Sequence, residues 1–457
     1  MNTISAPTGP QSNAPQQRPP SFWESNKLLI KGFVIGILIL IMLIPAAIIS
    51  DLVRERANRQ QEVVNEVSHK WAEPQTIVGP VLMLPYKTME KDSKGVVTET
   101  KSIAYFLPEK LNIKGSILPE TRHRSIYEVM LYRSDLTFTG NFDNLNLASL
   151  NIKPEQVIWN EARLAVGIQD TRGLDDETNF TWNNGNQKLE PGVPDNNIMA
   201  TGISNLVNVD AAGSNQFSIK LKLKGSEYFY VTPVGKTTLV NISSPWSNPA
   251  FDGKYLPDTN ADVTQQGFNA TWKIQQASRP YPQSWVSGTH RLAESAFGVR
   301  LIQPTDNYAK TERSVKYALL FIGLTFAVFF FIELLQKKQI HPLQYLLVGI
   351  ALSVFYTLLL SFSEYIGFNK AYVIAAAATI ALIGLYVWSM FHKAKIAIGF
   401  TLALGSLYAY IFFLIQLQDY ALLFGSIGLF VVVALAMYSS RKIDWDHIKT
   451  RSPSGSE

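Results

Sequence analysis

The sequence contains no cysteine, and only 17% of its residues are charged. The lack of cysteine excludes a disulfide framework and a thiolate metal site. The low charge content points to charge-free regions, because soluble proteins carry about 25% charged residues. With 47% hydrophobic residues, the chain is not wholly disordered. A net charge of +5 over 457 residues is slight, so we expect no nucleic-acid partner.

The charge deficit is confined to six long apolar runs. The first, residues 28–49, has one charge near its start, Lys31, and is long enough for the roughly 20 helical residues that cross a bilayer. The apolar region of a signal peptide is shorter, about 7–15 residues, so this run predicts an uncleaved anchor. Five further runs predict five more membrane spans, at residues 317–335, 342–362, 371–390, 396–415 and 420–438.

Basic residues beside the spans predict the orientation, because Lys and Arg in short loops stay on the cytoplasmic side. The loops that alternate with them carry Glu364 with Lys370, and Asp419 alone. We therefore predict that both termini are cytoplasmic and that the polar segment 51–313 lies outside. The basic residues at the cytoplasmic ends are Arg18, Lys27, Lys31, Lys337, Lys338, Lys393, Lys395, Arg441, Lys442, Lys449 and Arg451.

These observations predict a division of the chain into five parts. Residues 1–27, rich in Pro, Gln, Asn and Ser, form a disordered cytoplasmic tail. Residues 28–50 are the transmembrane anchor, and residues 51–313 form the extracytoplasmic domain. A five-helix transmembrane bundle occupies residues 317–438, and residues 439–457 form a second cytoplasmic tail.

The extracytoplasmic segment is predicted to be rich in β-strands. A helix continues from the anchor to Trp71, where Glu73-Pro74 ends it. Beyond it, apolar and polar residues alternate over residues 217–224, with Lys220, Lys222 and Lys224 on the wet face, and residues 126–140 behave similarly. Short strands and an Asn184-Gly185 turn favour an antiparallel, sandwich-like fold in one or two lobes. The polar segment 175–197 is then a loop or a lobe boundary.

An ordered series of motifs runs through most of the chain. It includes RQQEVVNEVSHKWAEPQTIVGPVLMLPY (59–86), VGIQDTRG (166–173), RPYPQSW (279–285) and the stretch FGVRLIQPTDNYAKTERSVKYALLFIGLTFAVFFFIEL from Phe297. The series resembles the CreD family of inner-membrane proteins, described as cell envelope integrity proteins of Gram-negative bacteria. One departure is Ser125, which stands where the family pattern has Gly.

This resemblance implies a multi-pass protein of the bacterial inner membrane, with its large domain in the periplasm. It also implies a connection with envelope stress beside a two-component regulatory system. The family has no established enzymatic reaction, so no catalytic residues are carried over from it.

The search for catalytic or metal-binding motifs is negative. Gly235-Lys236-Thr237 is similar to the end of a phosphate loop, but Tyr230 stands where the first Gly of that loop belongs. The six His residues have no i, i+3 or i, i+4 partners among themselves. We therefore predict that the protein is not an enzyme and has no catalytic residues, no cofactor and no metal site.

Glu333 and His341 are the candidate functional residues of the membrane region, because an ionisable group in a span is a functional candidate by default. Lys337 follows Glu333 at i+4, which favours an ion pair at the helix end over an ion relay. His341-Pro342 opens the next span, a position where Pro is favoured and His can sit at the interface. Both candidates flank one short inner loop, so contact between them is an open alternative.

Three functions remain open. The leading hypothesis is a non-enzymatic envelope protein whose partners are the lipid bilayer and an envelope protein or glycan bound by the periplasmic domain. The second is a transporter or lipid-handling permease, supported by the polar residues Ser353, Tyr356, Thr357 and Ser361 on one span. The third is a membrane sensor that signals through a separate partner. The sequence leaves the oligomeric state open.

Overall fold

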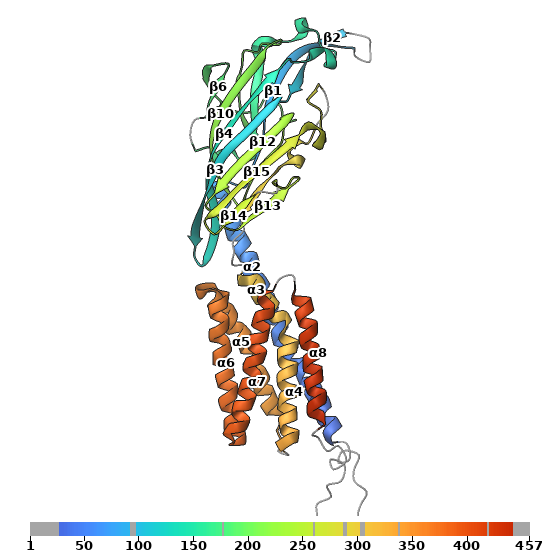
Figure 1. The fold of residues 1–457 in the computed structure, drawn as a ribbon, viewed down its shortest axis with the longest axis vertical. Helices are drawn as coiled ribbons and strands as arrows, with labels where there is room; N and C mark the ends of the chain where they lie inside the picture. Colours follow the sequence, from blue (N-terminus) through green and yellow to red (C-terminus); the bar gives the residue numbers. More distant parts are fainter. Residues whose placement is uncertain are drawn as a thin grey trace, which may run out of the picture. The chain divides into compact units, whose positions relative to one another are not determined.

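The computed structural model describes residues 27–91, 97–175, 178–258, 261–286, 290–301, 307–336, 339–417 and 420–441 (Figure 1). It separates into a β-rich unit, Ala57–Thr305, and a helical unit made of Met1–Arg56 and Asp306–Glu457. Several features of the sequence fall outside the described residues. These are the tail residues 1–26 and 442–457, the acidic pair Asp176-Glu177, Lys337, Lys338 and Asp419.

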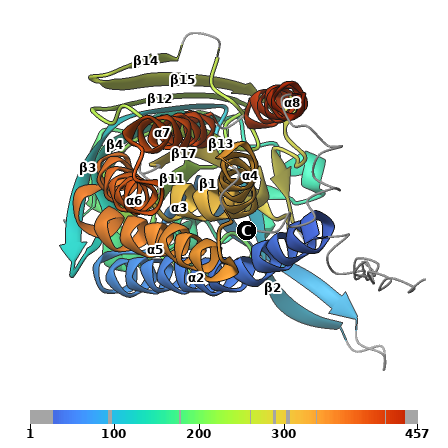
Figure 2. The same cartoon turned by 90° about the horizontal axis from the view of Figure 1, so that it is seen from below.

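The helical unit contains the apolar helices that the sequence predicts, seen end-on in Figure 2. Five helices are long and apolar enough to cross a membrane, and a sixth has a shorter apolar segment, Ala421–Leu435. An N-terminal span followed by later spans is thus confirmed; five of the six predicted spans have the length and composition of a membrane-crossing helix, and the apolar segment of the sixth, in α8, is shorter. The helices are α2 (Lys27–Trp71), α4 (Ala318–Gln336), α5 (Pro342–Ile366), α6 (Phe368–Phe391), α7 (Ala394–Gln416) and α8 (Ala421–Ser440).

Exposed apolar side chains cover these helices, including Trp388, Leu422 and Phe430. Such surfaces lie in the lipid bilayer. The first helix is longer than a bilayer requires, since α2 continues without a break to Trp71. It ends just before Glu73-Pro74, as predicted.

A short polar helix, α3 (Asn307–Lys316), precedes α4 and belongs to the helical unit. The Asn307 side chain donates to the carbonyl oxygen of Ser363 at 3.2 Å and accepts from the N–H of Phe368 at 3.1 Å. The Tyr308 hydroxyl donates to Glu364 at 3.0 Å. These bonds attach α3 to the junction of α5 and α6.

The β-rich unit consists of two sheets. The nine-stranded sheet has the order β13 (Pro249–Gly253), β17 (Phe297–Leu301), β11 (Tyr228–Val231), β1 (Gln75–Lys91), β5 (Arg163–Ile168), β9 (Gly202–Leu206) and β8 (Glu190–Pro191). In addition, β2 (Val97–Phe106) pairs with β1, and β16 (Ser284–Trp285) pairs with β2. All pairs are antiparallel except β1–β11, which is parallel.

The eight-stranded sheet carries the longest continuous surface of the unit. Its order is β14 (Asp262–Thr264), β15 (Gly267–Gln275), β12 (Thr237–Ser244), β3 (Lys110–Arg124), β4 (Tyr127–Asp143), β10 (Ser214–Ser226), β6 (Asn179–Trp182) and β7 (Gly185–Lys188). The pair β3–β12 is parallel and the others are antiparallel. The predicted sheet-rich fold is therefore confirmed, with one parallel pair in each sheet.

One cluster of buried side chains draws on both sheets, so the sheets share a single core. Trp272, Phe138 and Phe180 contribute from the eight-stranded sheet, and Leu82 and Phe229 from the other. The alternation predicted for residues 217–223 holds along β10, whose apolar residues face this core. Burial of alternate side chains leaves the opposite face of each strand exposed.

The prediction of a loop or lobe boundary at residues 175–197 is wrong in its described part. The segment holds the hairpin β6–β7 and strand β8, because Phe180 and Trp182 are buried in the shared core. The hairpin turn lies at Asn183-Asn184 instead of Asn184-Gly185. Both Asn residues have positive φ, 46° and 68°, a conformation that Asn tolerates, and Gly185 pairs with Trp182 as the first residue of β7.

Candidate functional site

Glu333 of α4 lies in a buried polar cluster that joins three segments of the helical unit. Its carboxylate forms an ion pair with Lys31 of α2, which lies 302 positions away in the sequence. It also accepts from the backbone N–H of Ile340 at 3.1 Å and from the Tyr345 hydroxyl of α5 at 2.9 Å. The expected partner, Lys337, lies outside the described residues.

The geometry gives Glu333 a structural part in this cluster. Its residue exposure is 6%, and both carboxylate oxygens have donors. Lys31 also donates to the carbonyl oxygen of Ile340 at 2.8 Å. A buried charge requires this kind of compensation, because an unpaired one is strongly destabilising. The cluster therefore fastens the first helix to α4 and to the start of α5.

His341 is exposed and caps the N-terminus of α5. Its Nδ1 accepts from the N–H of Leu343 at 3.2 Å, and its own N–H donates to the Gln344 side chain at 3.1 Å. Among the described residues no hydrogen bond or ion pair joins His341 to Glu333. The two are linked through Ile340, whose N–H binds Glu333 and which precedes His341 in the chain.

A pocket of about 500 Å³ lies beside this cap. His341 and Lys31 reach the same pocket, whereas Glu333 is not part of its lining. The remaining wall is largely apolar. The lining residues are Ile30, Lys31, Val34, Gln339, Ile340, His341 and Pro342.

The polar residues of α5 that suggested transport do not share one surface. Ser353 is buried and donates to the carbonyl oxygen of Gly349 in its own helix at 3.0 Å. Tyr356 is fully buried within an aromatic cluster. Thr357 and Ser361 are exposed on the outside of the helix. The four side chains therefore do not line a common path.

The Asp-x-Arg-Gly motif at residues 170–173 forms a tight turn in the β-rich unit. Asp170 accepts from the backbone N–H of Glu73 at 2.9 Å and from Nε and Nη2 of Arg172, both at 2.9 Å. Arg172 also donates to the carbonyl oxygen of His69, in the last turn of α2, at 2.7 Å. A Cβ on Gly173 would lie 2.5 Å from the carbonyl oxygen of Lys224, so this approach requires glycine.

The charge of Asp170 depends on these bonds. Burial by itself raises the pKa of the Asp170 carboxyl, but hydrogen bonds from Arg172 and from the N–H of Glu73 outweigh it. The pKa lies below the ordinary value of aspartate as a result. The motif therefore joins the end of α2 to the sheets.

A regular polar surface lies on the eight-stranded sheet. Four rows of outward-facing residues cross β10, β4, β3, β12 and β15, and none of these residues is buried. We call this surface the polar face. In row order it comprises Gln216, Asn141, Lys110, Thr237 and Gln275; Ser218, Thr139, Asn112, Leu239 and Lys273; Lys220, Thr137, Lys114, Asn241 and Thr271; and Lys222, Asp135, Ser116, Ser243 and Asn269.

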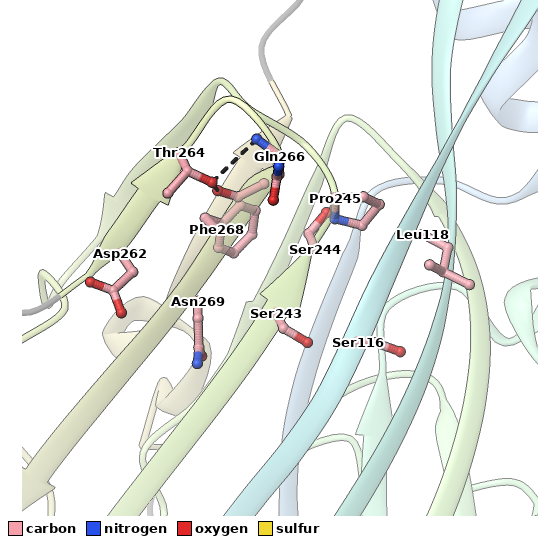
Figure 3. A pocket seen from close by; sticks show the side chains of 11 residues that line it. Ser116, Leu118, Ser243, Ser244, Pro245, Asp262, Thr264, Gln266, Phe268 and Asn269 are labelled. Carbon is pink, nitrogen blue, oxygen red and sulfur yellow. Dashed lines mark hydrogen bonds between the residues drawn. The ribbon is translucent and has the colours of Figure 1, made fainter.

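A pocket of about 470 Å³ lies at the edge of the polar face, and we call it the edge pocket. Asp262, Asn269, Ser243 and Ser116 cross adjacent strands within it, so it continues the fourth row of the polar face (Figure 3). The β14–β15 turn closes one side. Gly267 is required there, because at φ +135° its Cβ would lie 2.1 Å from the carbonyl oxygen of Ser244.

The composition of the edge pocket suits a polyhydroxylated ligand. Its exposed lining is mainly apolar, and the hydroxyl, amide and carboxylate groups that lie along the adjoining strands can each bond a ligand hydroxyl. Leu118, Pro245 and Phe268 add apolar surface. The full lining is Ser116, Leu118, Ser243, Ser244, Pro245, Asp262, Thr264, Gln266, Gly267, Phe268 and Asn269.

Sequence reasoning found part of this surface and missed the rest. It placed Lys220 and Lys222 on the wet face of one strand. It did not align them with Lys114 and Lys273, because the alignment depends on the pairing of five strands. The alternating segments KLNIK and TWKIQ carry the local signal. In the helical unit, Lys31 served only to orient the chain, and its pairing with Glu333 was not predicted.

Comparisons with known proteins agree over nearly the whole chain. The family model described as "Inner membrane protein CreD" matches residues 27–446. The inner membrane protein CreD of Escherichia coli strain K12 is 32% identical over 440 residues, which cover 93% of this chain and 94% of that protein.

Among solved structures, a crystal structure of a proposed protease from Parabacteroides distasonis matches 55% of this chain and 50% of its own. The sequence identity is 11% and the TM-score 0.22. A likeness this weak carries no argument about fold or activity.

Proposed function

Because this chain belongs to the CreD family of inner membrane proteins, we propose that its β-rich unit lies in the periplasm and binds a component of the cell envelope. Both termini then lie in the cytoplasm. The role is one of binding without catalysis. The observation that carries this proposal is the polar face, a regular and exposed surface on the eight-stranded sheet.

The distribution of basic residues supports the orientation. Lys393 lies between α6 and α7, Lys395 lies in the first turn of α7 and Arg441 follows α8, whereas the loops at the opposite ends of these helices are nearly free of basic residues. Lys and Arg in short loops stay in the cytoplasm, while long domains cross the membrane regardless of their charge.

The orientation is tested directly, because the chain has no cysteine of its own. Asn186→Cys places a single thiol on the exposed β6–β7 hairpin, and Lys395→Cys places one in the exposed first turn of α7. A membrane-impermeant maleimide should label Asn186→Cys in cells whose outer membrane is permeabilised. It should label Lys395→Cys only after lysis. The reverse pattern would overturn the orientation.

Features of the β-rich unit favour binding over catalysis. Catalytic groups work best where water is excluded and donors are preorganised. The polar face is instead broad and open, and the edge pocket lies at its rim. A surface of this kind suits an extended ligand that makes many weak polar contacts.

The binding role is tested by photocrosslinking the full-length protein in native envelopes. A photoreactive residue at Thr137, in the interior of the polar face, is compared with one at Glu155, an exposed residue outside it. We expect a reproducible adduct with an envelope component at position 137 and none at position 155. Equal capture at both positions, or none at position 137, would refute the role of the polar face.

A further inference from the structure

The polar face has an excess of positive charge. It carries five lysines, Lys110, Lys114, Lys220, Lys222 and Lys273, and one acidic residue, Asp135. In the part of the chain that the structure describes, Lys110, Lys114, Lys220 and Lys273 form no ion pair. By contrast, the basic residues just beyond the fourth row are compensated, since Arg133 and Lys224 both pair with Asp175.

The spacing of the lysines allows them to act together. Lys114 and Lys220 flank Thr137 in one row, two strand spacings or about 10 Å apart. The Debye length is about 10 Å at 0.1 M salt, so an anionic ligand lying across these positions experiences their combined charge.

The edge pocket adjoins this charge. Ser116 and Ser243 belong both to the fourth row, which contains Lys222, and to the pocket lining. Ser116 lies two residues beyond Lys114 on the same face of β3, about 7 Å away, so a ligand that fills the pocket can extend along β3 onto Lys114 and from there across the third row to Lys220. Asp262 gives the pocket a negative group of its own, so the part bound there is neutral and rich in hydroxyls.

From these observations we propose that the ligand of the polar face is an anionic saccharide. A sugar unit occupies the edge pocket, and the acidic groups of the saccharide lie over Lys114 and Lys220. This assignment rests on the proposed binding function and gives it a ligand class.

Two other anionic partners fit the surface less well. Protein interfaces are anchored by Trp, Tyr and Arg, and the polar face contains none of these residues. A membrane surface engages proteins through apolar insertion together with basic residues, and Leu239 is the one apolar residue of the polar face. Short hydroxyl and amide side chains fill the space between the lysines, as recognition of a hydroxyl-rich ligand requires.

The test uses the full-length protein in nanodiscs of zwitterionic phosphatidylcholine. The probes are polygalacturonate oligomers, neutral maltodextrin of the same length, poly-glutamate of the same charge and vesicles containing anionic phosphatidylglycerol. We expect polygalacturonate to bind more tightly than every other probe. Its affinity should fall as salt rises from 0.1 M to 1 M, where the Debye length is about 3 Å.

Variants separate the lysines from the pocket. Lys114→Gln with Lys220→Gln should weaken polygalacturonate binding by about tenfold to thirtyfold, while the corresponding Arg double variant keeps it. Ser243→Trp fills the edge pocket without changing charge, and should weaken saccharide binding but leave poly-glutamate binding as it was. Lys153→Gln with Lys254→Gln is the matched control, since both lysines lie outside the polar face. Unchanged thermal melting of each variant establishes that it is folded.

The outcomes are distinct. Equal binding of maltodextrin and polygalacturonate, or tighter binding of poly-glutamate or vesicles, would overturn the saccharide assignment. If a photoreactive residue at position 137 still captures an envelope component, the proposed binding function survives the loss of the saccharide assignment. If it captures nothing, the binding function and the saccharide assignment both fail. If polygalacturonate binds as expected, the same binding measurement is made with peptidoglycan strands and with delipidated lipopolysaccharide core. The tighter binder of the two then shows whether the natural acid groups are carboxylates or phosphates.

Discussion

Removing one member of the Lys31–Glu333 ion pair should destabilise the helical unit more than removing both. The perturbations are Lys31→Met, Glu333→Gln and the double variant. In the native protein the side chain of Glu333 is 8% exposed and that of Lys31 is 22% exposed. The two single variants are therefore unequal, because they leave different charges behind.

The magnitudes follow from that difference. Lys31→Met leaves a buried carboxylate without its cation, which costs about 3–5 kcal/mol. Glu333→Gln leaves Lys31 bound to the carbonyl oxygen of Ile340 and able to extend toward water, so the loss is nearer about 1.5–3 kcal/mol. The double variant has no uncompensated charge and should lose about 1–3 kcal/mol. The expected coupling energy is at least about 1.5 kcal/mol.

The assay is unfolding of each variant by SDS titration in mixed micelles, followed by circular dichroism. Lys370→Met is the control, because it removes an exposed lysine of α6 and should change the free energy of unfolding by less than about 0.5 kcal/mol. If the loss in the double variant equals the sum of the single losses, the two residues do not act as a pair.

Three further predictions concern other contacts. Asp170 contributes stability that is fully present above its unfolded-state pKa of about 3.9 and is lost as pH falls through its lower folded-state pKa. Asp170→Asn should therefore flatten the fall, at acid pH, of the free energy of unfolding measured with urea. Gly140→Ala should cost about 2–4 kcal/mol in the same assay, because the new Cβ would lie 2.1 Å from a carbonyl oxygen of the neighbouring strand. Gly349→Val should cost about 1–3 kcal/mol in SDS unfolding, because its Cβ would lie 2.7 Å from Met42 of α2.

Each of these has a matched control. Arg172→Lys is the control for Asp170→Asn, because it keeps the positive charge near Asp170 but loses the forked geometry. If the pH dependence of unfolding at acid pH is unchanged in Asp170→Asn, the Asp170 carboxylate is not its source. Ser218→Ala on the polar face should leave urea unfolding within about 0.5 kcal/mol of wild type. Gly32→Ala in α2 is the control for Gly349→Val in α5, because no atom lies within 4 Å of the Cβ added at Gly32. Wild-type unfolding of Gly140→Ala would show that the approach of the Lys110 carbonyl oxygen does not require glycine, and wild-type unfolding of Gly349→Val would show that the Met42 side chain can move aside.

The extent to which the sequence predicts this protein differs between its two units. The membrane helices follow from apolar length, which is a local property of about 20 residues. The loop prediction for residues 175–197 failed because polar residues surround Phe180 and Trp182, and their burial depends on a core assembled from distant strands. The β6–β7 hairpin turn lies one residue earlier than predicted, because Asn183 and Asn184 both accept positive φ.

By itself, the sequence determined the membrane anchor, the later spans, the strand-rich character of the central region and the outward side of β10. Each depends on periodicity or length within one segment. Only the tertiary structure paired Lys31 with Glu333, across 302 positions of sequence. It alone placed Lys114 and Lys220 on either side of Thr137, next to the row that continues into the edge pocket. The reason is physical: strand order and register result from burying the opposite face of the sheet in a shared core, and no single strand specifies them.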